Sequence, residues 1–281
     1  MKKTGVIGLG TMGAGIAQVL LLHGFSLKIW DVDPDIGRVC YSRLIKQAKK
    51  SARKGLVTQE EAERMQQQLS LCQDLADFAD REFIIEAVFE NIAVKRDMFS
   101  KLEQAVSPET ILASNTSSIS ITSIAKDLTH KQRVVGLHFF NPPQYMKLVE
   151  VVRGYMTNDE TLEASVTLIK QMGKEPIVVK DTPGFIVNRI LVPMIAEAIK
   201  LVESGVASCA DIDQAMVLGA NLPQGPLKLA DMVGLDVILH VQEIFYQAFG
   251  NAACKPSVLL RQMVDSGHLG MKTGKGFYDY Q

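Results

Sequence analysis

The sequence predicts an α/β protein in which a mostly parallel sheet domain is followed by an all-helical domain. Short apolar strands alternate with helical stretches as far as residue 180, which is the pattern of a parallel sheet whose strands are joined by helices. The Pro/Gly segment DTPGF (residues 181–185) ends this alternation, and the apolar spacing after it is helical. We therefore expect two domains, residues 1–180 and residues 181–281.

Composition and charge exclude several functional classes. The net charge is −1 and the sequence pI is about 6.5, so we expect neither nucleic acid nor an anionic membrane as a partner. The uncharged run that ends at Leu22 imitates a signal peptide or a membrane span, but five glycines interrupt it, and we expect no membrane segment. The four cysteines are scattered without a CxxC pair, which suits a cytoplasmic protein and argues against a metal site.

The first 31 residues carry the pattern of a dinucleotide-binding, Rossmann-type unit. A strand over residues 4–7 leads into GLGTMG at residues 8–13, and helical spacing follows from residue 14 to residue 23. A second strand over residues 26–30 ends in Asp31, which stands 23 residues after Gly8. Strand, GxGxxG, helix, strand and acid in this order predict a domain that binds a dinucleotide.

Each part of this turn suits a part of the cofactor. Gly8 permits a tight turn, Gly10 lets the backbone approach the pyrophosphate, and Gly13 allows close packing of the helix on the strand. The helix N-terminus directs N–H groups and the positive end of its dipole toward the phosphates. Asp31 can accept from both ribose hydroxyls, and further carboxylates at positions 33 and 35 repel a 2′-phosphate, so we expect NAD. The cofactor-binding residues expected here are Gly8, Gly10, Thr11, Met12, Gly13 and Asp31.

Residues 35–68 are polar, helical in composition and rich in basic side chains. The default interpretation is a solvated helical hairpin that turns near Gly55. The alternative is an anion site for a phosphate-bearing substrate, because five basic residues fall within nine positions. Both interpretations stay open for Lys46, Lys49, Lys50, Arg53 and Lys54.

The next segments extend the parallel sheet. A strand at residues 82–87, a helix at 92–105 and a strand at 110–113 lead into the hydroxyl-rich segment SNTSS, residues 114–118. This segment either caps a helix that begins near Ser120 or binds a ligand at the carboxyl end of a parallel strand, and one loop can do both. A helix at residues 157–172 and a last strand at residues 175–179 complete the first domain. Four helices form the second domain, at residues 186–203, 209–218, 231–249 and 257–265.

The stretch GLHFFNPPQYMKLVE (residues 136–150) contains a candidate acid–base pair. Two β-rich runs, joined by a loop with two prolines, could lie side by side and bring His138 opposite Glu150. A carboxylate that accepts a hydrogen bond from the N–H of one imidazole nitrogen orients the ring and raises the basicity of the other nitrogen. The alternative is a surface histidine and a strand-edge glutamate that do not meet.

Motifs spread over nearly the whole chain resemble the L-3-hydroxyacyl-CoA dehydrogenase family, and its bacterial short-chain members most closely. They occur in the family's order, which is far more specific than any one of them: GVIGLGTMGAGIAQV, EAVFENIAVKRDMF, ILASNTSSISIT, GLHFFNPPQYMKLVEVV, DTPGFIVNRILVPMIAEAI, GANLPQGPLKLADMVGLD and GMKTGKGFYDY. The resemblance implies NAD-dependent, reversible oxidation of an (S)-3-hydroxyacyl-CoA, with 3-hydroxybutyryl-CoA as the expected substrate.

The resemblance also implies a role for individual residues. His138 would be the catalytic acid/base and Glu150 its orienting partner, while Ser117 and Asn188 would bind the reacting oxygen of the substrate. Asn141 would belong to the substrate site. Lysines such as Lys50 and Lys54 resemble those that meet coenzyme A phosphates, Glu90, Lys95 and Asn115 would lie near the cofactor, and the helical domain would form a homodimer.

The sequence departs from the family pattern at a few positions, none of which removes a proposed catalytic residue. They could alter the preferred acyl chain or the fit of the cofactor, and they are Phe89, Gln144, Tyr145, Leu222 and Gln224. Two rival functions remain: a dehydrogenase of small free β-hydroxyacids, whose lysine motif we do not find, and a non-catalytic NAD-binding protein on the same scaffold.

Overall fold

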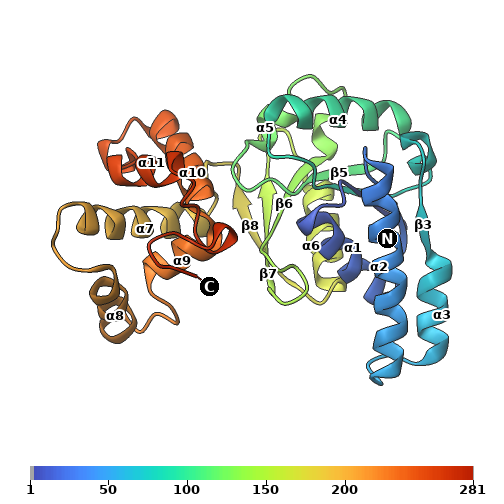
Figure 1. Cartoon of the computed structure of the whole chain (residues 1–281). Coiled ribbons are helices and arrows are strands. Elements are labelled where there is room, and N and C mark those ends of the chain that lie inside the picture. The colour runs from blue at the N-terminus through green and yellow to red at the C-terminus, as the bar shows by residue number, and fades with distance from the viewer. Residues whose placement is uncertain (1–2, 281) are drawn as a thin grey trace. The chain divides into compact units, whose positions relative to one another are not determined.

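The computed structural model of the chain describes residues 3–280 and confirms the predicted fold class. The chain divides into two compact units, of which the first extends to Thr182 and the second begins at Pro183. The first unit is a sheet flanked by helices and the second unit is helical (Figure 1). The division falls inside the Pro/Gly segment at residues 181–185.

One eight-stranded sheet forms the centre of the first unit, in the order β3-β2-β1-β4-β5-β6-β7-β8. The pair β6–β7 is antiparallel and the other neighbouring strands are parallel. The order reverses between β1 and β4, which is the point where open α/β sheets bind dinucleotides. The strands are β1 Lys3–Ile7, β2 Ser26–Trp30, β3 Leu69–Leu71, β4 Phe83–Glu86, β5 Ile111–Ser114, β6 Val134–Phe139, β7 Leu148–Arg153 and β8 Glu175–Lys180.

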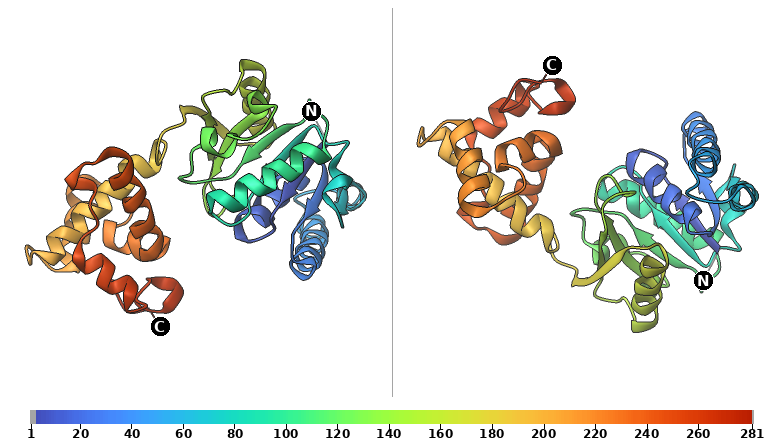
Figure 2. Two further views of the ribbon diagram at one scale, coloured as in Figure 1. Left: turned by 90° about the horizontal axis from the view of Figure 1, so that it is seen from above. Right: turned by 90° about the horizontal axis from the view of Figure 1, so that it is seen from below.

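Helices cover both faces of this sheet. Across Figures 1 and 2, α1 and α6 lie on one face, while α4 and α5 lie on the other. Apolar side chains of α1 and α6, such as Ile16 and Leu168, share a buried core with Leu27 and Val151 of the strands. The helices of this unit are α1 Thr11–Leu22, α2 Pro34–Arg53, α3 Gln59–Gln68, α4 Ile92–Ala105, α5 Ile121–Ile124 and α6 Asp159–Gln171.

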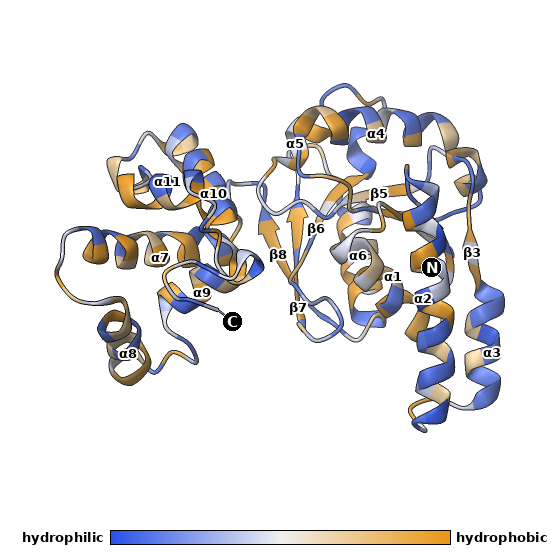
Figure 3. Cartoon of the chain, viewed as in Figure 1, coloured by the Kyte–Doolittle hydropathy of each residue, from blue (hydrophilic) through white to orange (hydrophobic). Residues whose placement is uncertain are grey.

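The lysine-rich segment forms the predicted helical hairpin, with α2 packed against α3. Gly55 stands in the turn with φ = +69°, a conformation that costs little only for glycine. Both helices carry a broad hydrophilic face, in contrast to the hydrophobic strands of the sheet (Figure 3). The two helices were expected from composition, whereas β3, which follows them directly, was not.

The second unit is built from five α-helices among the residues that the structure describes, α7 Val187–Glu203, α8 Cys209–Ala220, α9 Pro226–Val233, α10 Leu235–Phe249 and α11 Val258–Asp265. The expectation of one helix over residues 231–249 is wrong. Gly234 has φ = +107°, which lies outside the helical region, and it separates α9 from α10. No helix in residues 3–280 has both the length and the apolar character needed to cross a membrane.

Two buried aspartates hold the C-terminal segment against the second unit. Asp231 accepts hydrogen bonds from the main-chain N–H groups of Phe277 and Tyr278, both at 3.0 Å, and from the Tyr280 hydroxyl at 2.9 Å. Asp213 accepts from the Tyr278 hydroxyl at 2.8 Å. Burial and these carboxylates raise the pKa of both tyrosines, so the hydroxyls stay protonated and act as donors.

Candidate active site

Except for Lys50, Lys54 and Lys95, the predicted site residues of the first unit lie along one edge of the sheet, in the order of its strands. Parallel strands end at the same edge, so segments that are distant in sequence become neighbours there. Along this edge stand Asp31 after β2, the glycine turn after β1, Glu90 after β4, Asn115 and Ser117 after β5, His138 at the end of β6 and Glu150 on β7.

A cavity of about 920 Å³ opens where β1 meets β4. Its walls include the predicted residues Gly8, Gly10, Thr11, Met12 and Asp31. Apolar side chains from β2 and the residues after it, from α2 and α4 and from the loop after β4 line most of the rest, among them Trp30, Val32, Ile36, Phe89, Val94 and Met98. A pocket with a carboxylate at the end of β2, a glycine turn and a largely apolar wall suits a dinucleotide with its ribose, phosphates and bases.

The three glycines of the turn differ in what restricts them. Gly8 has φ = +84°, and a Cβ there would come within 2.8 Å of the Ala87 carbonyl oxygen. A Cβ on Gly13 would lie 1.7 Å from the Gly8 carbonyl oxygen, so close helix packing requires that glycine. A Cβ on Gly10 would meet no protein atom within 4 Å, so packing inside the protein does not explain this glycine. The open space beside Gly10 fits the approach of a pyrophosphate.

Asp31 is held in the cavity wall by the main chain. Its Oδ2 accepts from Leu9 N at 2.6 Å and its Oδ1 accepts from Asp33 N at 3.0 Å. The carboxylate therefore links the end of β2 to the glycine turn. A carboxylate fixed at this place can accept hydrogen bonds from the ribose hydroxyls, and its negative charge repels a 2′-phosphate.

Lys95, on α4, is fully buried and forms the centre of a network of charges behind the cavity. Its Nζ lies 2.7 Å from Glu86 Oε1 and 3.3 Å from Glu90 Oε2. Glu86, at the end of β4, also accepts from Val88 N at 2.7 Å and from Ser114 Oγ at 2.6 Å. Lys95 is thus placed beneath the cavity wall and is not among the residues that line it.

Glu90 organises the hydroxyl-rich loop after β5. Its Oε1 accepts from Thr116 Oγ1 at 2.6 Å and from Ser117 N at 2.9 Å, and it lies 3.3 Å from the hydroxyl of Ser117. Burial alone raises the pKa of Glu90, but the Lys95 charge and the hydrogen bonds from Thr116 and Ser117 outweigh it and lower the pKa below its usual value. The same loop also caps a helix, because Ser120 Oγ accepts from Ser123 N. The loop therefore provides the N-cap of α5, while ligand binding by the segment at residues 114–118 stays a prediction.

His138 and Glu150 meet in the structure as the sequence suggested. They face each other across the antiparallel pair β6–β7, and His138 Nδ1 lies 2.7 Å from Glu150 Oε2. Their side chains are only 7% and 1% exposed, so water does not screen the contact. A carboxylate that accepts a hydrogen bond from Nδ1–H leaves Nε2 as the basic nitrogen. The Phe140 ring lies 4.4 Å from the imidazole, centroid to centroid.

Three predicted asparagines occupy different places. Asn115 Oδ1 accepts from Phe139 N at 3.1 Å, so this side chain ties the loop after β5 to the strand of His138. Asn141 is exposed in the loop after β6, where it precedes Pro142 with a cis peptide bond. Asn188 stands in the first turn of α7, in the second unit, and its contact with the substrate stays a prediction.

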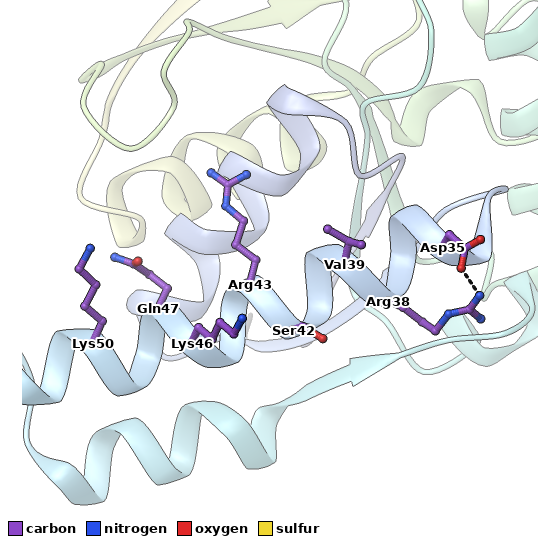
Figure 4. Close-up of a pocket in the computed structure, with 8 residues that line it drawn as sticks. All are labelled: Asp35, Arg38, Val39, Ser42, Arg43, Lys46, Gln47 and Lys50. Carbon is purple, nitrogen blue, oxygen red and sulfur yellow. Dashed lines mark hydrogen bonds and ion pairs between the residues drawn. The ribbon is translucent and has the colours of Figure 1, made fainter.

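The basic hairpin presents a hollow of about 670 Å³ along α2. Arg43, Lys46, Gln47 and Lys50 project from one side of the helix around it, and an Asp35–Arg38 ion pair closes one end (Figure 4). Of the two lysines expected to bind phosphates, Lys50 lines this hollow. Lys54 is exposed at the end of α2 and is not part of the lining.

Glu86 is the site residue that the sequence interpretation missed. It stands at the end of an apolar strand, FIIE, where a carboxylate is buried only if it is paired. That position was the available signal, together with a lysine nine residues later on the following helix. The pairing itself depends on the fold of α4 back over β4.

The dinucleotide crevice and the buried imidazole further along the same edge place the chain among the NAD-dependent oxidoreductases. More narrowly, it belongs to the 3-hydroxyacyl-CoA dehydrogenase family. The model of that family's NAD-binding domain matches residues 3–182, and the model of its C-terminal domain matches residues 184–280. The expected family and the expected cofactor, NAD, are confirmed.

Individual relatives agree with this assignment. The chain is 45% identical over its full length to a Bacillus subtilis protein named "Probable 3-hydroxybutyryl-CoA dehydrogenase", 98% of which is covered. It is 42% identical to human mitochondrial hydroxyacyl-coenzyme A dehydrogenase, with 100% of this chain and 92% of that protein covered. The crystal structure of (S)-3-hydroxybutyryl-CoA dehydrogenase from Ralstonia eutropha is similar with a TM-score of 0.95 and 40% identity, covering 100% of this chain and 99% of that one.

Proposed function

We propose that this protein catalyses the reversible, NAD-dependent oxidation of (S)-3-hydroxyacyl-CoA, with 3-hydroxybutyryl-CoA as the main substrate, to the 3-ketoacyl-CoA. The buried His138–Glu150 pair carries the proposal, because it supplies a base with a defined basic nitrogen beside a dinucleotide site. The names of the relatives support the choice of substrate.

In the proposed mechanism His138 Nε2 accepts the proton of the 3-hydroxyl group during oxidation and returns it during reduction. Glu150 holds the ring through Nδ1 and stabilises the imidazolium that forms. NAD, when bound, supplies the hydride acceptor. Ser117 and Asn188 hydrogen-bond the oxygen that reacts, and Asn141 contacts the substrate beside them. The loop of Ser117 is preorganised by Glu90, so little ordering remains at the moment of reaction.

The coenzyme A part of the substrate is proposed to bind along α2. Besides Arg38, which is paired with Asp35, the hollow there carries the cations of Arg43, Lys46 and Lys50, and Lys54 extends the positive charge beyond it. A phosphate-bearing tail is complementary to such a surface, since Arg and Lys both bind phosphate oxygens.

We also propose a homodimer formed through the helical unit and a cytoplasmic location. Large apolar side chains are exposed on that unit, for example Ile190 at 68% and Leu218 at 75%, and exposed apolar surface commonly marks an interface. Free thiols at all four cysteines suit a reducing compartment.

The test of the function is the oxidation of NADH with acetoacetyl-CoA, run beside free acetoacetate and beside NADPH. The proposal predicts rapid turnover only with the thioester and NADH. Turnover with free acetoacetate would favour a free β-hydroxyacid dehydrogenase, and binding of NADH without turnover would favour a non-catalytic protein.

The coenzyme A site has its own matched pair of variants, Lys50→Ala and Lys49→Ala. Lys49 is exposed on the same helix but does not line the hollow. Lys50→Ala is expected to raise KM for acetoacetyl-CoA roughly fivefold, since an exposed ion pair contributes up to about 1 kcal/mol. Lys49→Ala should leave KM unchanged, and equal effects of both variants would remove Lys50 from the site.

A further inference from the structure

The loop between β6 and β7, residues 140–147 and called the hairpin loop below, joins the strand of His138 to the strand of Glu150. At its start, the Phe140 ring lies against the imidazole of His138. At its middle, Pro143 packs on the cofactor-binding helix α1, where a Cβ on Gly15 would come within 2.9 Å of Pro143 Cγ. The hairpin loop therefore touches both the proposed base and the helix that carries the glycine turn.

The shape of the hairpin loop leaves main-chain carbonyl groups without partners from a regular ladder. Two prolines remove N–H donors, and the N–H groups of Tyr145 and Met146 both point to the Pro142 carbonyl oxygen, at 3.0 and 3.1 Å. Main-chain carbonyl groups that are taken from water need a donor from elsewhere. A side chain from outside the loop supplies it.

That side chain is Lys174, which immediately precedes β8. It is 7% exposed, and its Nζ donates to the carbonyl oxygens of Pro143 at 2.6 Å and Met146 at 2.8 Å, with Gln144 O at 3.5 Å. No Asp or Glu in the described part of the chain forms an ion pair with it. Burial lowers the pKa of Lys174, which is the effect expected for an ammonium group whose partners are dipoles rather than charges.

We propose that Lys174 is a positioning residue for the reaction assigned to His138 and Glu150, so that this inference rests on the proposed function. Its ammonium group donates hydrogen bonds to main-chain carbonyl oxygens of the hairpin loop and so holds the loop against α1. The fixed loop in turn keeps Phe140 on the imidazole. A displacement of about 1 Å in such a group can cost on the order of 100-fold in rate, although Lys174 itself touches no reacting atom.

Three variants separate this role from a general loss of packing. Lys174→Met keeps the length of the side chain and removes its donors, while Lys174→Arg keeps donors and charge. Lys170→Met is the control, because Lys170 is exposed on α6, four residues earlier. Lys174→Met should lower kcat by roughly 10- to 100-fold and leave the Kd for NADH within about twofold, whereas Lys174→Arg should recover much of kcat. Parallel losses in kcat and in NADH affinity would overturn the proposal.

Hydrogen exchange of the hairpin loop provides a measurement that does not depend on turnover. In Lys174→Met the amides of Tyr145 and Met146 should exchange about tenfold faster or more, while the amides of α1 and α4 keep their rates. Unchanged exchange in the loop, or equal acceleration throughout the first unit, would refute the role of Lys174. A failure of the proposed function would be seen separately, as a wild-type protein without turnover on acetoacetyl-CoA.

Discussion

Replacement of Lys95 by methionine is the perturbation whose cost the structure defines best. Lys95 is 0% exposed and lies between Glu86, whose side chain is 1% exposed, and Glu90, whose side chain is 28% exposed. Removing one partner of a buried ion pair costs about 3–5 kcal/mol, because an unpaired charge stays behind. We expect a value of about 3 kcal/mol, since Glu86 keeps two other hydrogen-bond donors and Glu90 is partly solvated.

The same helix offers the control. Lys101 pairs with Asp97 at 2.7 Å, the same distance as Lys95 to Glu86, but both of these side chains are more than half exposed. An exposed i,i+4 pair contributes about 0.3–0.5 kcal/mol, so Lys101→Met should be almost neutral. The two lysines of α4 thus differ about sixfold or more in expected cost, because Lys95 is buried between two carboxylates and Lys101 forms one exposed pair.

The assay is urea unfolding followed by tryptophan fluorescence. Trp30 is the single tryptophan of the chain and lies on β2, so its emission reports the first unit. The double variant Lys95→Met with Glu86→Gln should be less destabilised than the sum of the single changes, because the fully buried Glu86 carboxylate no longer stays behind as an unpaired charge. A cost of Lys95→Met within 1 kcal/mol of that of Lys101→Met would show that the buried charge network does not stabilise the first unit.

Three further predictions concern the cofactor site and the second unit. The pKa of Glu90 in the folded protein lies below its unfolded value of about 4.3, so the stability that ionised Glu90 contributes is complete above that pH and is lost as the pH falls through the folded pKa. The urea midpoint of the wild type should therefore fall more steeply below about pH 4.5 than that of Glu90→Gln. Parallel curves for the two proteins would contradict this. Asp31→Ala should weaken NAD binding at least about tenfold in calorimetric titration while weakening NADP binding less, and an equal loss for both would contradict the repulsion argument. Tyr280→Phe removes the hydrogen bond to Asp231 and should cost about 1 kcal/mol, measured by scanning calorimetry, where an unchanged midpoint would show that the bond contributes nothing.

The sequence predicted best those features that depend on short, contiguous patterns. The glycine turn, the helix after it and Asp31 follow from spacing within 31 residues, and the structure places them around one cavity. The hairpin of α2 and α3 could be predicted equally well, because its signals, the helical composition and Gly55 at the turn, lie within one short stretch of sequence.

Very short elements, and helix breaks caused by one unusual backbone angle, could not be predicted in the same way. β3 has three residues and too little alternation to be recognised as a strand. The break at Gly234 interrupts an apolar spacing that runs smoothly across it, and only the positive φ ends the helix. Such exceptions leave the periodicity intact.

Residues whose partners are far away in the chain form the largest gap. Lys174 contacts a loop about 30 residues before it, through main-chain carbonyls that no side-chain pattern marks. Glu86 acts through its contacts with Ser114 and Lys95, which come together only when β4, β5 and α4 have packed. Loop length alone does not determine whether His138 and Glu150 face each other, because that depends on the register in which β6 and β7 pair.

The proposed mechanism depends most directly on His138 as the acid/base, and the replacement His138→Gln tests this role. We would measure kcat for acetoacetyl-CoA together with the Kd for NADH, with His240→Gln, an exposed histidine of α10, as the control. We expect a loss of about 10²–10⁴-fold in kcat with an unchanged Kd, and no effect of His240→Gln. Normal turnover by His138→Gln would show that His138 is not the acid/base.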